Sequence, residues 1–108
     1  GTSGVFGGWA SVGGSQARHM MVMSVGWNPY FDNQERTVEP WILHDFGRDF
    51  YGEDIRLVTC IYIRPEANFD SLEALVARIH EDAAATRAAL KTPELAAFAA
   101  HPFLAPAS

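Results

Sequence analysis

The feature of the sequence that most limits its fold is an apolar run, IRLVTCIYI, at residues 55–63. Its many β-branched residues favour a β-strand. Alternate side chains of a strand face opposite ways. Both faces are apolar here, with Ile55, Leu57, Thr59, Ile61 and Ile63 on one and Val58, Cys60 and Tyr62 on the other. Such a strand is expected to be buried on both sides, as it would be in a closed barrel with a helix on its outside.

Three earlier segments also have the composition of strands, at residues 5–12, 20–25 and 37–46. Turn residues at positions 13–16 predict that the first two form a β-hairpin. Gly7 and Gly8, inside the first strand, indicate a bend or the close approach of another backbone. Pro40 in the third strand cannot donate a backbone hydrogen bond, so we expect a sheet edge or a bend there.

A helix is predicted after the strands, ending near Leu90. Asp70 is its predicted N-cap, with Glu73 placed three positions later as in a capping box. Helical spacing predicts the face that packs on the sheet, formed by Leu72, Leu75, Val76, Ile79 and Ala83. A second short helix is predicted at residues 94–100. Strands followed by a helix indicate a mainly β domain at residues 1–92, with residues 93–108 as a C-terminal tail.

Residues 26–33, GWNPYFDN, combine chain-breaking Gly and Pro with aromatic and amide side chains. An ordinary turn needs only Gly, Pro, Asn or Asp, so large side chains on a loop favour a segment that holds a ligand. We interpret it as a lid over a ligand site. The aromatic side chains Trp27, Tyr30 and Phe31 would cover the ligand, and the amide of Asn28 would reach a polar edge of it.

Composition excludes several classes of protein. A net charge of −5 and a pI near 5.2 argue against a nucleic-acid partner, and 48% hydrophobic residues argue against disorder. No apolar run is long enough for a membrane span, and the His residues lack the spacing of metal ligands. Cys60 is the single cysteine, which excludes a disulfide within the chain. We therefore expect a reducing compartment, the cytoplasm, with the mitochondrion and the plastid as alternatives.

Three stretches in order, MVMSVGWNPYFDN, TVEPWILHDFGRDFYGEDIRL and YIRPEANFDSLEALVARIHED, make the chain similar to riboflavin kinases (flavokinases). The resemblance is greatest to the plant and algal branch, and it covers the chain from residue 4 or 5 to about residue 90. It implies a six-stranded antiparallel Greek-key barrel with a C-terminal helix. It also implies transfer of the γ-phosphate of ATP to the terminal ribityl hydroxyl of riboflavin, which yields FMN.

The same resemblance implies roles on the catalytic and nucleotide side. Glu39, in VEPWILH, matches the catalytic carboxylate that accepts the proton of the attacking hydroxyl. Ile42, His44 and Tyr51 match positions that line the ATP pocket. In an ideal strand Glu39 would face away from Ile42 and His44. Either Pro40 bends the strand, or the nucleotide wraps around its rim.

Four further residues are implied on the flavin side. Arg64, Ala67 and Phe69, in RPEANF, match positions that contact the flavin. Ala67 stands where relatives often have Lys, so its contact is expected to be through the backbone. Arg64 would offer its guanidinium fork to a phosphate or to a flavin carbonyl. Asn28 matches a mobile flap beside the substrates.

The family's N-terminal Gly-rich stretch and Pro-Thr-Ala-Asn motif, which hold Mg²⁺ and the ATP phosphates, have no counterpart in this sequence. We therefore expect Mg²⁺ and ATP to act in a complete enzyme, with an N-terminal segment or a second chain completing the barrel. Two alternatives remain open. One is a catalytically inactive, kinase-derived domain that serves as a structural subunit or a flavin- or nucleotide-binding module. The other is a small β-barrel that binds a different ligand.

Overall fold

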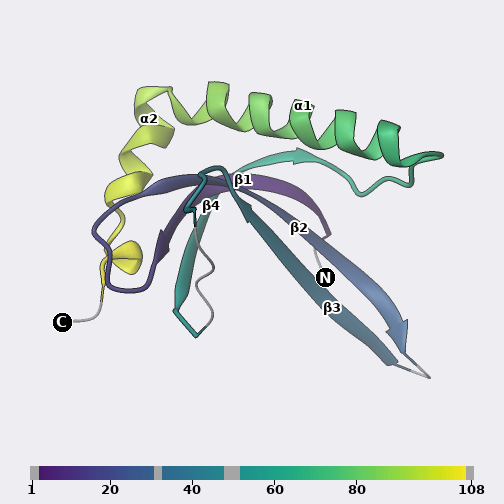
Figure 1. The fold of residues 1–108 in the computed structure, drawn as a ribbon, viewed down its shortest axis with the longest axis horizontal. Coiled ribbons are helices and arrows are strands. Elements are labelled where there is room, and N and C mark those ends of the chain that lie inside the picture. Colours follow the sequence, from purple (N-terminus) through teal and green to yellow (C-terminus); the bar gives the residue numbers. More distant parts are fainter. Residues whose placement is uncertain (1–2, 31–32, 48–51, 107–108) are drawn as a thin grey trace.

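The chain forms one antiparallel sheet with a helix across it (Figure 1). The computed structural model describes residues 3–30, 33–47 and 52–106. Its strands are β1 (Gly4–Val12), β2 (His19–Tyr30), β3 (Asn33–Ile42) and β4 (Ile55–Arg64). They lie in the order β3-β2-β1-β4, and every neighbouring pair is antiparallel. The predicted fold class, mainly β with a C-terminal helix, is confirmed.

The outer strands of the described sheet are β3 and β4. Pro40 lies on β3, in keeping with the predicted edge position of that strand. The apolar run at residues 55–63 belongs to β4, where every residue is half-buried or exposed. The prediction that both of its faces would be buried is therefore wrong for the described residues, in which β4 is an outer strand paired with β1.

The glycine pair in β1 lies where other parts of the chain come closest. The predicted β1–β2 hairpin is confirmed, with pairs running from Gly4 and Val25 to Ala10 and His19. A Cβ atom at Gly7 would lie 2.7 Å from the Thr86 hydroxyl oxygen on the helix above it. A Cβ atom at Gly8 would clash with the backbone of β4. These contacts confirm that the glycines mark a close approach.

The segment predicted to be a lid is mostly strand. Strands β2 and β3 pair from Met21 and Ile42 as far as Tyr30 and Asn33, and the long hairpin extends away from the rest of the molecule (Figure 1). The prediction of a loop over residues 26–33 is therefore wrong for residues 26–30 and for Asn33. Phe31 and Asp32 lie outside the described residues. A partner strand satisfies the backbone hydrogen bonds that Gly, Pro and Asn were expected to interrupt.

The main helix, α1, spans Leu72–Leu90. Its N-cap is Ser71, with extended backbone angles and a hydroxyl that accepts a hydrogen bond from the Ala74 amide at 3.1 Å. The prediction of Asp70 as the cap is wrong by one residue, because the Ser71 hydroxyl fills that role. None of the helices in the described part is both long enough and apolar enough to cross a membrane.

The chain after α1 packs against the sheet through three short helices, α2 (Pro93–Ala96), η1 (Ala97–Ala100) and η2 (Pro102–Leu104). The predicted short helix at residues 94–100 thus appears as α2 followed by a 3₁₀ turn. Trp9 of β1 donates its indole N–H to the Leu95 carbonyl at 2.9 Å, and Arg18 donates to the Ala99 carbonyl at 3.0 Å. Leu104 is fully buried.

Helix α1 is buried along its second half only. Its buried residues are Asp82, Ala83, Thr86 and Leu90. Leu72 and Val76 are 74% and 44% exposed, and Leu75 is 36% exposed. The prediction that these three residues pack the helix on the sheet is wrong, and only Ala83 of the predicted face is buried. The core lies between the second half of α1 and the residues Val5, Ala10, Val12, Met21, Val22 and Val25.

Candidate functional site

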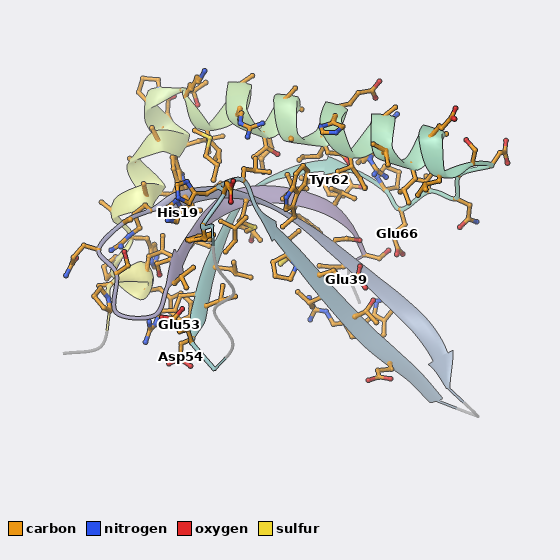
Figure 2. All side chains as sticks on the ribbon, viewed as in Figure 1. His19, Glu39, Glu53, Asp54, Tyr62 and Glu66 are labelled. Carbon is orange, nitrogen blue, oxygen red and sulfur yellow. The ribbon has the colours of Figure 1, made fainter. Side chains whose placement is uncertain are left out.

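The first half of α1 stands over a pocket of about 400 Å³, which we call the Arg64 pocket. Its walls come from β1, β2, β3, the end of β4, the segment that follows β4, and α1. Glu39, Arg64, Ala67 and Phe69 all line it. Figure 2 shows Glu39 on β3 and Glu66 on the segment that leads into α1. The structure therefore brings together four residues that the sequence had placed in catalytic and flavin-side roles, from positions up to thirty residues apart.

The guanidinium of Arg64 is held by Asp82 of α1. Arg64 donates from Nε to Oδ1 of Asp82 at 2.9 Å and from Nη2 to Oδ2 at 2.8 Å, which is a bidentate pair. Both side chains are nearly buried, at 10% and 5% exposure. The hydrogen bond to Asp82 raises the pKa of Arg64 above its ordinary value. The positive charge of Arg64 is therefore matched inside the protein.

The same guanidinium organises the segment that follows β4. Its Nη1 donates to the carbonyl of Pro65 at 3.1 Å. Its central carbon lies 5.6 Å from the centre of the Phe69 ring, within cation–π range. Three of the five guanidinium N–H groups are thus engaged.

Glu39 stands at the rim of the Arg64 pocket. The residue is exposed and lies opposite Ser24 in the β2–β3 register. Its carboxylate makes no ion pair or hydrogen bond with any side chain that the structure describes. A carboxylate in this state is available to accept a proton from a hydroxyl in the pocket.

A second pocket, of about 360 Å³, adjoins the same strand, and we call it the His44 pocket. Ile42 and His44, the predicted nucleotide contacts, both line it, and Pro40 and Trp41 line both pockets. The opposite orientations expected for Glu39 and the Ile42/His44 pair thus correspond to two neighbouring pockets with a shared wall. Tyr51, the third predicted nucleotide contact, lies outside the described residues.

His44 belongs to a cluster of rings that the sequence did not reveal. The imidazole of His19, from the start of β2, stacks on that of His44 with ring centres 4.4 Å apart. Phe46 meets both rings edge-on, at 5.0 and 4.7 Å. Burial, and secondly the neighbouring His44, lower the pKa of His19 below its ordinary value. The His19 ring lies directly behind the His44 ring.

Two other acidic residues of the Arg64 pocket were missed. Asp82 could have been found from helical spacing, because it continues the stripe of Leu75 and Ile79 and a carboxylate on an apolar stripe needs a partner. For Glu66, the sequence offers no indication of a place at the pocket beyond its position in RPEANF. Asn28 pairs with Glu35 in the β2–β3 register, and the structure describes the backbone of Asn28 but not its side chain.

The described residues contain no group of three His, Cys, Asp or Glu side chains that could hold a metal ion. The two carboxylates at the pocket without an ion pair, Glu39 and Glu66, come from separate segments. Such an arrangement offers a Mg²⁺ ion at most one or two carboxylate ligands, so the other oxygens of its octahedron would come from water and substrate phosphates.

Comparison with known proteins identifies the family. The family described as "Flavokinase: Riboflavin kinase" matches residues 1–90 of the chain. This chain belongs to the riboflavin kinase family. The resemblance inferred from the three sequence stretches is confirmed.

Individual riboflavin kinases support the assignment. The chain is 56% identical over 102 residues to a bifunctional riboflavin kinase/FMN phosphatase of Arabidopsis thaliana, covering 94% of the chain and 27% of that protein. It is 45% identical over 93 residues to the riboflavin kinase of Homo sapiens, covering 86% of the chain and 59% of that protein. The chain is also similar to the crystal structure of riboflavin kinase from Trypanosoma brucei, with a TM-score of 0.79 and 33% sequence identity. The match covers 99% of this chain and 68% of the Trypanosoma brucei chain. The chain thus spans between about a quarter and three-fifths of these two curated relatives.

Proposed function

We propose that the protein transfers the γ-phosphate of ATP to riboflavin, giving FMN and ADP. The observation that carries the proposal is the meeting of Glu39, Arg64, Ala67 and Phe69 at one pocket, with Ile42 and His44 at the next. Membership of the riboflavin kinase family supports the same reaction. The two pockets share Pro40 and Trp41, so two substrates lying in them would meet beside Glu39.

Riboflavin is proposed to occupy the Arg64 pocket. A volume of about 400 Å³ lies within the roughly 300–1,000 Å³ of small-molecule sites. Trp41 and Phe69 offer aromatic surfaces to a flat ring system, and Leu75 and Ile79 add an apolar cover from α1. Asn28 is proposed as a further flavin contact, since it lies on the strand that brings Ser24 to the pocket wall.

ATP is proposed to occupy the His44 pocket, with Ile42, His44 and Tyr51 as its contacts. The stacked ring of His19 supports His44 from behind, which fixes the plane offered to the nucleotide. Where this site meets the Arg64 pocket, phosphoryl transfer depends mainly on positioning and on charge neutralisation.

Glu39 is the proposed general base. As the riboflavin hydroxyl oxygen forms its bond to the γ-phosphorus, Glu39 accepts the hydroxyl proton, and the bond from that phosphorus to the bridging oxygen of ADP breaks. The position of Glu39 before Pro40, on a paired strand, limits its backbone freedom. When bound, Mg²⁺ would neutralise charge on the ATP phosphates, and the roles above are those of the chain's own residues.

We further propose that a second chain, or a segment beyond the described residues, adds to an outer strand of the sheet, because unpaired strand edges favour strand addition. The proposed compartment is the cytoplasm. The single cysteine, Cys60, is free, as is usual for a protein of a reducing environment.

The test replaces Glu39 by Gln in the protein and measures FMN formation and riboflavin binding separately. We expect kcat to fall by about 10²- to 10⁴-fold, with the riboflavin Kd from fluorescence titration nearly unchanged. Glu35→Gln, which removes another exposed carboxylate from β3, is the matched control and should leave kcat unchanged. Near-normal turnover by Glu39→Gln would rule out the proposed base. Riboflavin binding without turnover by the parent protein would favour a binding module.

A further inference from the structure

Asp82 is an unusual residue for its place in the fold. It is 4% exposed and lies on the side of α1 that carries Leu75 and Ile79 over the Arg64 pocket. Its bidentate pair with Arg64 accounts for both carboxylate oxygens, and Arg78 approaches Oδ1 only to 3.9 Å. A buried ion pair often contributes no more stability than a well-packed apolar pair of similar volume. The fold alone therefore gives weak reason for a carboxylate at this position.

The pair has a clear geometric effect at the pocket. Residues 65–70 between β4 and α1 have no regular secondary structure, yet they supply Ala67 and Phe69 to the pocket wall. Arg64 contacts this segment at both ends, through the Pro65 carbonyl and the Phe69 ring. Asp82 sets the plane of the guanidinium, because bidentate pairing fixes its orientation. The orientation of this wall is thus tied to one carboxylate on α1.

The pair also determines what Arg64 can recognise. Asp82 matches the guanidinium charge and occupies one full edge of the fork. The two N–H groups that remain can still donate to a neutral acceptor such as a carbonyl oxygen. A phosphate dianion would gain less from an arginine whose charge is already neutralised at 2.8 Å.

We propose that Asp82 is a positioning residue of the flavin side, which holds Arg64 and Phe69 in place and reserves Arg64 for a neutral carbonyl of the flavin ring. The inference rests on the proposed function, since it takes the Arg64 pocket as the riboflavin site. It predicts that riboflavin and FMN depend on Asp82 equally, because the FMN phosphate makes no charge contact with Arg64.

The test compares Asp82→Glu with the matched control Glu81→Asp. Both substitutions keep the charge and change the side chain by one methylene, but Glu81 is exposed. Binding of riboflavin, FMN and a non-hydrolysable ATP analogue is measured for each protein, together with the melting temperature. Asp82→Glu should weaken riboflavin and FMN by the same factor, about tenfold, and should leave the ATP analogue unchanged. Glu81→Asp should change none of them.

Several outcomes overturn the proposal. Unchanged flavin binding by Asp82→Glu would show that the pair is structural only, as would equal weakening of flavin and nucleotide. A much larger loss for FMN than for riboflavin would assign Arg64 to the phosphate. If the parent protein binds no riboflavin, both the proposed function and the role of Asp82 fail. If the parent protein and Asp82→Glu bind riboflavin equally well, only the positioning role of Asp82 is rejected.

A double variant covers the case in which Asp82→Glu does not fold. Arg64→Met combined with Asp82→Leu replaces the buried pair by apolar side chains, a change that buried ion pairs often tolerate. The folded double variant should still bind the ATP analogue and should lose at least tenfold in riboflavin affinity. Normal riboflavin affinity in this variant would overturn the proposal.

Discussion

The two halves of helix α1 serve different purposes. The second half buries Ala83, Thr86 and Leu90, with Thr86 directly over the Gly7 position of β1. The first half leaves Leu75 partly exposed above the Arg64 pocket. Asp82 lies where the two halves meet. One helix thus closes the core at one end and covers a candidate ligand site at the other.

The difference shows that apolar residues on a helix do not all mark a hydrophobic core. A side chain that contacts a ligand is expected to remain partly exposed until the ligand is present, whereas a core side chain is buried in every state. The comparison can therefore be tested by asking whether a substitution changes the stability of the fold or the affinity for a ligand.

The largest effect on stability is expected in the second half of α1. Leu90→Ala removes a fully buried side chain and should lower the free energy of unfolding by about 2–5 kcal/mol. Urea unfolding followed by circular dichroism measures the change. Where the variant is still folded, its riboflavin affinity should match that of the parent. A stability loss below about 1 kcal/mol would contradict the assignment of this half to the core.

A smaller effect is expected at the first turn of α1. Ser71→Ala removes the N-cap hydrogen bond to Ala74 and should cost about 1 kcal/mol of stability. Asp70→Ala, at the exposed neighbouring position, is the control and should cost much less. The same urea titration distinguishes them, and a greater loss in the Asp70 variant would restore Asp70 as the cap.

Much of the fold follows from local sequence patterns. Strand-like composition located all four strands, although the third was placed at residues 37–46 and β3 spans Asn33–Ile42. The turn at residues 13–16 located the first hairpin, because these signals depend on neighbours along the chain. The same patterns did not predict the strand at residues 26–30. Pairing with β1 ends at Val25, and beyond it β2 pairs only with β3. A strand paired on one side tolerates a proline such as Pro29, so Gly and Pro gave a false signal for a loop.

The candidate site was predictable in part. The resemblance to riboflavin kinases supplied Glu39, Arg64, Ala67 and Phe69, and the structure places all four at one pocket. Spacing alone could not have joined them, since they come from β3, from the end of β4 and from the segment that follows it. The partners Asp82 and His19 are distant in sequence from Arg64 and His44, so only the tertiary structure pairs them.

The most direct test of the account is riboflavin titration of Leu75→Ala, a change in the first half of α1. We predict a free energy of unfolding within about 1 kcal/mol of the parent, because Leu75 is partly exposed, and riboflavin binding about tenfold weaker, because the side chain covers the pocket. Flavin fluorescence quenching gives the affinity, and urea unfolding of the same sample gives the stability. Unchanged riboflavin affinity, or a stability loss as large as that of Leu90→Ala, would contradict the division of the helix into a half that holds the fold and a half that covers the flavin.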